Sequence, residues 1–346
     1  MTQPLATEGE IPTAETGGAG ALSGVDAATV PVAGRAGERD DPLAPGSTGR
    51  WVASHPLVLL YANVPALIMP TLHPKIAHVL SEKDRALNGS EGLPTLQATL
   101  RRLISTYEMV MGIVFAGPEA DDVAHGLYEL HRPIAGTMPD GSPYHAWNKD
   151  VWDWTWGSIL KGGLDIADTF RLFRDDEERQ AAYRGLVEIG VRYGVRGLPD
   201  TYDEFVAYWQ PIVDNTLAVG PEVQFILDHA LDPAPPRGFG WLPRPLWRLM
   251  ALPLLRIVRV GVLAGVPEKF HADLGLRTTA IDRIERRVHG FFWRHVPRRV
   301  SGNFAPAYFA LRRRFGNPGW RTFYSRAQLA ANRPAADEAR RAAVAG

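Results

Sequence analysis

Residues 94–115 read PTLQATLRRLISTYEMVMGIVF, and the spacing of the apolar residues in this stretch indicates the fold class. They recur at steps of three and four residues, as the side chains on one face of a helix do. The same periodicity continues from Trp51 onward, with few alternating β-branched runs to indicate strands. We therefore expect an all-α fold. The residues of this stripe are Leu96, Leu100, Leu103, Tyr107, Val110 and Val114.

A second stripe on the same segment mixes polar and apolar residues. Its members follow one another at steps of four, three and four residues, so a cation and a hydroxyl precede two apolar side chains on one helix face. Such a stripe could line a pocket with one polar end, or it could be a partly exposed face on which the arginine extends to water. The residues are Arg102, Thr106, Met109 and Ile113.

The composition excludes several kinds of site and partner. The 346 residues include 38 basic and 38 acidic side chains, so no net charge indicates binding to nucleic acid. The chain has no cysteine, which excludes disulfides, iron–sulfur clusters and a thiol nucleophile. Hydrophobic residues make up 45% of the chain, enough for one large core, and no interior linker is visible. We expect one folded domain over residues 50–325; the sequence does not indicate its oligomeric state.

The two ends of the chain differ from this domain. Residues 1–49 are rich in Gly, Ala, Pro and Thr and have almost no large apolar side chain, which predicts a disordered tail. This segment lacks the basic region and apolar run of a secretory signal, so we expect a cytoplasmic protein. Residues 326–346 are expected to form a basic C-terminal tail.

Gly and Pro residues divide the rest of the chain into further predicted helices. One apolar segment, residues 242–266, contains four arginines and three prolines, which disfavour a membrane-spanning helix. It is either a core helix whose arginines reach water or an interfacial helix in weak peripheral contact with a membrane. The helices are expected over residues 119–131, 148–161, 177–196, 202–219, 243–265, 278–295 and 303–315.

Several enzyme classes lack their motif in this chain. There is no GxSxG nucleophile elbow, no phosphate-binding P-loop and no HExxH zinc motif. A four-helix di-iron site needs two Glu-x-x-His elements, and only Glu268–His271 has that spacing. We do not expect these activities.

His131 and a group of tryptophans are the candidate functional residues that remain. The helix DDVAHGLYELH should end at His131, because Pro133 disfavours its continuation. A histidine there can interact with the helix dipole, or it can be an axial metal ligand whose second ring nitrogen bonds to the backbone. The tryptophans are either core residues or the wall of a site for a flat cofactor or substrate. They are Trp147, Trp152, Trp154 and Trp156.

Five stretches in this order resemble the rubber oxygenase (latex-clearing protein) and MpaB-type oxygenase family. The resemblance spans roughly residues 51–320, and its most specific part is Arg-x-x-x-Thr followed by His-x-x-x-x-Gly. The stretches are VPALIMPTLHPKIAHVLSEKD (64–84), RRLISTYEMVMGIVFAG (101–117), HRPIAGTMPDGSPYHAWNKDVWDWTW (131–156), YGVRGLPDTYDEFVAYW (193–209) and LGLRTTAIDRIERR (274–287).

This resemblance implies an all-helical domain with a globin-like core that holds one b-type haem. By position, His131 corresponds to the proximal ligand of the haem iron. Arg102 and Thr106 correspond to the polar pair on the distal side, where they would bind the cofactor and act on dioxygen. His73, in the matched His-Pro element, is a reserve candidate for the iron ligand, although a residue at this position can also cap a helix.

Two residues depart from the pattern of the family. Trp156 stands at a cofactor-binding position where many relatives have a second histidine, and Ser105 stands where rubber-cleaving members have a lysine. Ser105 disfavours rubber as the substrate. The sequence therefore predicts a haem-dependent oxygenase that acts with dioxygen on a small unsaturated, apolar substrate such as an isoprenoid or lipid. The alternative is a non-catalytic protein of the same fold that binds haem or a lipophilic ligand.

Overall fold

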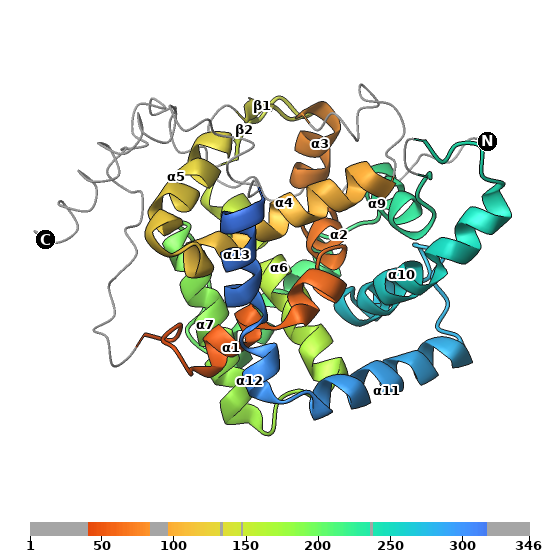
Figure 1. Cartoon of the computed structure of the whole chain (residues 1–346). Helices are drawn as coiled ribbons and strands as arrows, with labels where there is room; N and C mark the ends of the chain where they lie inside the picture. Colours follow the sequence, from red (N-terminus) through yellow and green to blue (C-terminus); the bar gives the residue numbers. More distant parts are fainter. Residues whose placement is uncertain (1–40, 84–95, 132–133, 147, 236–237, 317–346) are drawn as a thin grey trace, which may run out of the picture.

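The computed structural model describes residues 41–83, 96–131, 134–146, 148–235 and 238–316. Most of this part is helical, which confirms the predicted all-α class (Figure 1). A π-helical turn, η2 (Val58–Ala62), and two 3₁₀ turns, η3 (Gly117–Glu119) and η4 (Glu268–Phe270), lie between the helices. The helices are α1 (Thr48–Ser54), α2 (Pro65–Thr71), α3 (Pro74–Lys83), α4 (Leu96–Phe115), α5 (Ala120–His131), α6 (Lys149–Thr169), α7 (Asp176–Arg192), α8 (Tyr202–Asn215), α9 (Pro221–Leu231), α10 (Arg244–Gly265), α11 (Ala280–His295), α12 (Arg298–Ser301) and α13 (Phe304–Phe315).

A short hairpin, which the sequence analysis did not predict, follows α5. Strand β1 (Ala135–Thr137) pairs antiparallel with β2 (Pro143–His145), and Asp140 and Gly141 lie in the connecting turn. Gly141 has a φ of +84°, a conformation that glycine adopts without strain. The Tyr144 hydroxyl of β2 donates a hydrogen bond to the Glu82 carboxylate at 2.6 Å, which links the hairpin to α3.

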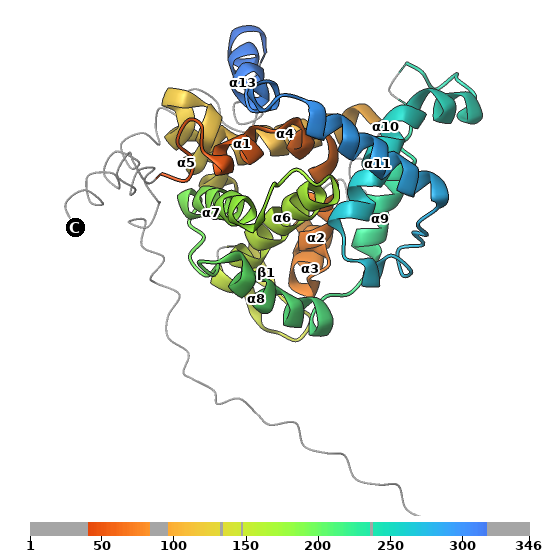
Figure 2. The same ribbon diagram turned by 90° about the horizontal axis from the view of Figure 1, so that it is seen from below.

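Helix α6 lies at the centre of the fold, where it contacts α2, α7 and α10 (Figure 2). It was expected to end at residue 161 but continues to Thr169. Gly162 faces Pro65 of α2 and Gly265 of α10, where a Cβ atom would make ordinary van der Waals contact. A glycine inside a helix does not by itself end it, so the predicted boundary was too early.

The folded part begins earlier than the predicted boundary at residue 50. Leu43 is only 1% exposed, and Asp41 accepts a hydrogen bond from the Arg192 guanidinium of α7 at 3.2 Å. Residues 41–49 are therefore part of the folded body, a correction to the expected tail. Composition alone does not reveal such contacts, so the predicted tail was too long. The rest of the expected N-terminal tail and the whole of the C-terminal tail lie outside the described residues.

Helix α1 packs on α7 through two glycines. A Cβ atom on Gly49 would lie 2.5 Å from the Cα of Gly185, and one on Gly185 would lie 2.3 Å from the Cα of Gly49. Real side chains do not approach a backbone so closely, so both positions require glycine. The contact holds the first helix of the fold against the middle of the chain.

The last helices of the chain pack against the first ones. The indole N–H of Trp51 in α1 donates to the hydroxyl of Ser301 in α12 at 3.0 Å. In α4 the fully buried Glu108 accepts hydrogen bonds from Tyr308 at 2.8 Å and from Arg312 at 2.5 Å, both in α13. A buried carboxylate is stable only with such partners, so these contacts fix α13 on α4.

Helices α10 and α11 lie side by side at the edge of the molecule (Figures 1 and 2). One prediction for this segment was that its arginines reach water, but Arg256 and Arg259 form ion pairs with Asp282 of α11. The other two, Arg244 and Arg248, pair with Asp232. Within the described ranges, no helix has both the length and the apolar character needed to cross a bilayer.

Candidate functional site

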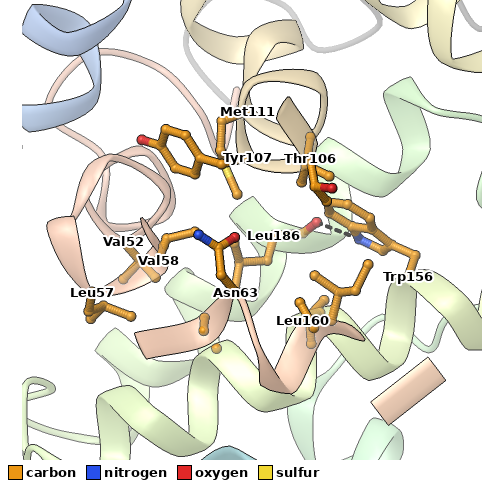
Figure 3. A pocket seen from close by; sticks show the side chains of 15 residues that line it. Val52, Leu57, Val58, Asn63, Thr106, Tyr107, Met111, Trp156, Leu160 and Leu186 are labelled. Carbon is orange, nitrogen blue, oxygen red and sulfur yellow. Dashed lines mark hydrogen bonds between the residues drawn. The ribbon is translucent and has the colours of Figure 1, made fainter. Parts of the chain in front are cut away.

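An apolar cavity of about 50 Å³ lies between α1, η2, α4, α6 and α7 (Figure 3). Most of its wall is aliphatic, and its polar side chains are Asn63, Thr106 and Tyr107. The lining residues are Val52, Leu57, Val58, Ala62, Asn63, Ala66, Thr106, Tyr107, Val110, Met111, Trp156, Ile159, Leu160, Gly163 and Leu186. Two of the predicted site residues, Thr106 and Trp156, therefore line the same cavity.

Trp156 forms a fixed wall of this cavity. Its indole N–H donates to the carbonyl oxygen of Leu186 in α7 at 2.9 Å, as Figure 3 shows. The ring lies directly over Gly190, where a Cβ atom would be only 2.3 Å from it. Because its one polar group is bonded and its ring is 7% exposed, Trp156 stays in place without any ligand.

Thr106 reaches the cavity from α4, one helical turn before Val110. The predicted second stripe of this helix is divided in the structure. Met109 and Ile113 are buried in the core, whereas Arg102 is partly buried, and it does not line the cavity. The expected distal pair thus contributes one of its two members to the cavity.

His131 is the last residue of α5, as the sequence predicted. Its Nδ1 lies 2.8 Å from the carbonyl oxygen of Leu127. A carbonyl only accepts hydrogen bonds, so the proton is on Nδ1 and the lone pair of the neutral ring is on Nε2. Burial lowers the pKa of His131, an effect that the bond to Leu127 opposes in part, and this favours the neutral ring. A neutral imidazole held in this tautomer is the form that ligates metals.

Trp152 lies between His131 and the cavity wall along α6. The His131 ring meets the Trp152 ring edge to face, with 5.2 Å between the ring centres. Trp152 is one helical turn before Trp156 and donates its N–H to the carbonyl oxygen of Tyr193 at 3.0 Å. The same face of α6 thus contacts His131 with one tryptophan and lines the cavity with the next. His131 itself is not among the cavity-lining residues.

None of the other candidate histidines lines the cavity. The Nδ1 of His73 accepts a hydrogen bond from the backbone N–H of Lys75 at 3.3 Å, which caps the start of α3. Its ring centre lies 6.0 Å from that of Trp154, and His73 does not line the cavity. His125 is buried and stacks on Tyr128, and His145 lies in strand β2.

The described residues contain no group of three or more His, Asp or Glu side chains arranged to hold a metal ion. A haem iron needs only one protein ligand, and the tautomer of His131 suits that role. The apolar cavity, which His131 does not line, is much smaller than the roughly 300–1,000 Å³ of ordinary cofactor sites. The donor chemistry therefore fits a haem, whereas its binding requires side chains around α4 and α6 to move apart.

Sequence reasoning missed two polar groups of the cavity. Tyr107 was assigned to the core stripe, yet its hydroxyl is buried without a hydrogen-bond partner in the described part of the chain, and burial raises its pKa. Asn63 follows the π-helical turn η2, a kind of irregularity that is frequent at functional sites. The sequence signals for these two polar groups were the phenol of Tyr107 within an apolar stripe and the amide of Asn63 shortly before Pro65.

A second cleft of about 450 Å³ lies where the C-terminal end of α10 meets α11. It is mostly polar, and Asp165, Glu268, Arg283 and Arg286 are among its lining residues. It contains none of the predicted site residues, so the apolar cavity remains the candidate site.

Comparison with known families identifies the chain. The family model described as "ER-bound oxygenase mpaB/B'/Rubber oxygenase, catalytic domain" matches residues 50–297, well over half of the sequence. The chain therefore belongs to this oxygenase family, and the resemblance inferred from its motifs is confirmed. Neither the curated proteins nor the solved structures include a match to it.

Proposed function

We propose that this member of the mpaB/rubber oxygenase family is a haem-dependent oxygenase that acts with dioxygen on an unsaturated, apolar substrate. The family supplies the oxygenase class. The observation that carries the haem assignment is the state of His131: a neutral ring at a helix end, protonated on Nδ1 by its bond to Leu127. In this tautomer Nε2 carries the lone pair that would bind iron.

In this proposal His131 holds the cofactor and Trp152 orients the histidine ring. The 5.2 Å edge-to-face contact restricts rotation of the imidazole, and the Leu127 carbonyl makes Nε2 a stronger donor. Trp156, fixed on Leu186, is a flat surface on which a porphyrin or a substrate can pack. When bound, the haem would supply the activation of dioxygen.

Thr106 and Arg102 are the proposed polar residues of the reaction. The Thr106 hydroxyl is one of the few polar groups of the cavity, so it can donate a hydrogen bond where water is excluded. Arg102 lies one turn earlier on the same helix, and its guanidinium can reach the same region if its side chain reorients.

The lining of the cavity supports an apolar substrate. Aliphatic side chains from α1, η2, α6 and α7 form most of the wall, and no charged side chain lies among the lining residues. Such a wall binds hydrocarbon and disfavours a charged group. The proposed substrates are therefore isoprenoid- or lipid-like molecules with a carbon–carbon double bond.

The first test is the absorption spectrum of the purified protein before and after addition of dithionite and carbon monoxide. We expect a Soret band and about one haem per chain. A colourless protein that also takes up no added haemin would exclude the proposal.

The second test separates the histidines. His131→Ala should lose most of its haem, whereas the matched variants His125→Ala and His145→Ala should retain it, with circular dichroism to check the fold of each. Arg102→Ala and Thr106→Ala should retain haem and lose turnover. Retention in His131→Ala together with loss in His73→Ala would move the ligand to the start of α3.

One observation favours a second candidate, a non-catalytic protein that binds haem or a lipophilic ligand. Trp156 is locked by Leu186 and Gly190 and closes one side of a small cavity, so little room remains for a substrate beside a cofactor. Consumption of dioxygen in the presence of an alkene such as squalene distinguishes the two functions, because a carrier would bind without turnover.

A further inference from the structure

Helix α11 packs on the fold through its charged face. Asp282 is fully buried and accepts hydrogen bonds from Arg256 at 2.7 Å and from Arg259 at 3.0 Å. Glu285, one turn later, binds Arg256 at 2.8 Å. Both acidic residues of α11 are thus used to attach the helix to α10, and Thr279 caps its start in a reciprocal bond with Asp282.

The apolar face of α11 points away from the protein. Its residues follow the steps i, i+3, i+7, i+10 and i+11 and so form one continuous stripe along the helix. Each is between 57% and 61% exposed, whereas amphipathic helices of globular proteins ordinarily bury this face. We call these residues the α11 stripe: Ile281, Ile284, Val288, Phe291 and Phe292.

Exposed arginines run beside the α11 stripe. Arg287 and Arg294 are seven residues apart, so they lie on the same side of the helix, next to the stripe. Neither forms an ion pair or a side-chain hydrogen bond with another described residue. The outer surface of α11 therefore combines hydrocarbon with unneutralised positive charge.

The first half of α10 also exposes large apolar side chains. Leu249 and Met250 in its first half are well exposed, as is Trp241 just before the helix. Figures 1 and 2 both show this part of α10 projecting beyond the body of the fold. Several large apolar side chains exposed on two neighbouring helices are the mark of an interaction surface.

We propose that the α11 stripe docks this protein on the surface of an anionic lipid bilayer. A helix with an apolar face and arginines beside it lies in the plane of the interface, with its side chains among the acyl chains and its guanidinium groups at the phosphates. This inference is independent of the haem and of the reaction proposed above.

Charge argues against a second copy of the chain as the occupant. A symmetric dimer through the α11 stripe would bring the same arginines of both copies together, with no free carboxylate on α11 to neutralise them. An anionic lipid surface supplies the opposite charge along the whole helix, and it adapts to a convex apolar surface without a preformed groove.

The test is co-sedimentation of the full-length protein with vesicles. Vesicles of phosphatidylcholine mixed with phosphatidylglycerol should bind the protein, and vesicles of phosphatidylcholine alone should bind it much more weakly. The double variant Ile284→Ser/Phe291→Ser should bind about a hundredfold more weakly, because two large side chains no longer enter the hydrocarbon. Leu311→Ser, an equally exposed apolar residue of α13, is the matched control and should bind as the wild type does.

Charge is tested separately with Arg287→Gln. Its binding to the anionic vesicles should fall about fivefold, the effect of one cation near such a surface. Arg184→Gln, which removes an exposed arginine from α7, should have no effect. Failure of the wild type to bind anionic vesicles, or equal binding by the Ile284→Ser/Phe291→Ser variant, would overturn the proposal. The proposal would also be overturned if the wild type formed a dimer that bound no vesicles and if the Ile284→Ser/Phe291→Ser variant were a monomer.

Discussion

The helices around the cavity and the pair α10–α11 are both amphipathic, but they are oriented in opposite ways. Around the cavity, the tryptophans of α6 pack inward, and the indole N–H of each donates to a backbone carbonyl oxygen. In α11 a carboxylate is fully buried and five large apolar side chains face outward. Hydrophobic periodicity therefore identifies a helix and its apolar face, whereas the partners of its charged residues decide which face is buried.

The largest expected effect is on Asp282, the residue that orients α11. Asp282→Ala leaves Arg256 and Arg259 without this partner and removes the carboxylate that accepts hydrogen bonds from Thr279 in the capping box, so the free energy of unfolding should fall by about 3–5 kcal/mol. Urea unfolding followed by circular dichroism measures this. Asp282→Asn, which keeps the cap but not the charge, should lose less. A loss below about 1 kcal/mol in the alanine variant would mean that apolar contacts, and not the ion pairs, hold α11.

The second-largest effect is expected at His55, a buried histidine that has no counter-charge. His55 is 1% exposed and accepts a hydrogen bond from the backbone N–H of Leu57 at 3.2 Å. Burial, with a smaller contribution from the Arg298 charge, lowers the pKa of His55 to about 4. The unfolded chain therefore takes up this proton more readily than the folded one.

The free energy of unfolding should consequently fall as the pH decreases from 6.5 toward about 4, by about 3 kcal/mol at the lower end. Urea midpoints measured across this pH range give the slope. His55→Gln removes the titrating group, so its stability should vary much less over the same range. An equal slope in both proteins would assign the acid sensitivity to other residues.

Third in size is the packing of Trp156. Gly190→Ala places a methyl group 2.3 Å from the indole ring, which must shift, and the stability should fall by about 2 kcal/mol. The matched control is Gly163→Ala, on the cavity side of α6, where a Cβ atom meets nothing within 4 Å. This control should be neutral or slightly stabilising, because alanine favours the helix. Equal stability of the two variants would mean that the ring can move freely.

The smallest effect is expected at the exposed end of α10. Arg248 binds Asp232, but the guanidinium side chain is 58% exposed, so solvent screens the ion pair. Arg248→Ala should be indistinguishable from the wild type in urea unfolding. A clear loss of stability would show that even solvent-exposed ion pairs of α10 stabilise the fold. The difference between the buried Asp282 and the exposed Arg248 would then be smaller than expected.

The order and class of the elements could be predicted from the sequence because apolar spacing and proline positions are local signals. Helix α5 ends at His131 as expected, and α13 begins and ends within one residue of its prediction. The continuation of α6 past Gly162 could not be predicted, because a glycine is compatible both with the end of a helix and with its interior. The outward orientation of α11 likewise depends on arginines of another helix.

The candidate site was predictable in part. Helical spacing and family resemblance selected Thr106 and Trp156, and the structure places both in one cavity. The position of His131 behind Trp152 depends on how α5 packs on α6, which no local pattern specifies. Its role as the iron ligand stays a prediction, as do the roles of Arg102 and Thr106.

Because α12 and α13 pack on α1 and α4, the fold can be completed only late in the synthesis of the chain. Trp51 bonds to Ser301, 250 positions later, and Glu108 is neutralised only when Arg312 has left the ribosome. Until almost the whole described chain is synthesised, a carboxylate destined for burial and the apolar surface around it stay exposed. Contacts between such distant residues also slow folding. Nascent chains should therefore depend on chaperones late in translation, and ribosome-stalled chains that end before α13 should be the forms most sensitive to proteolysis.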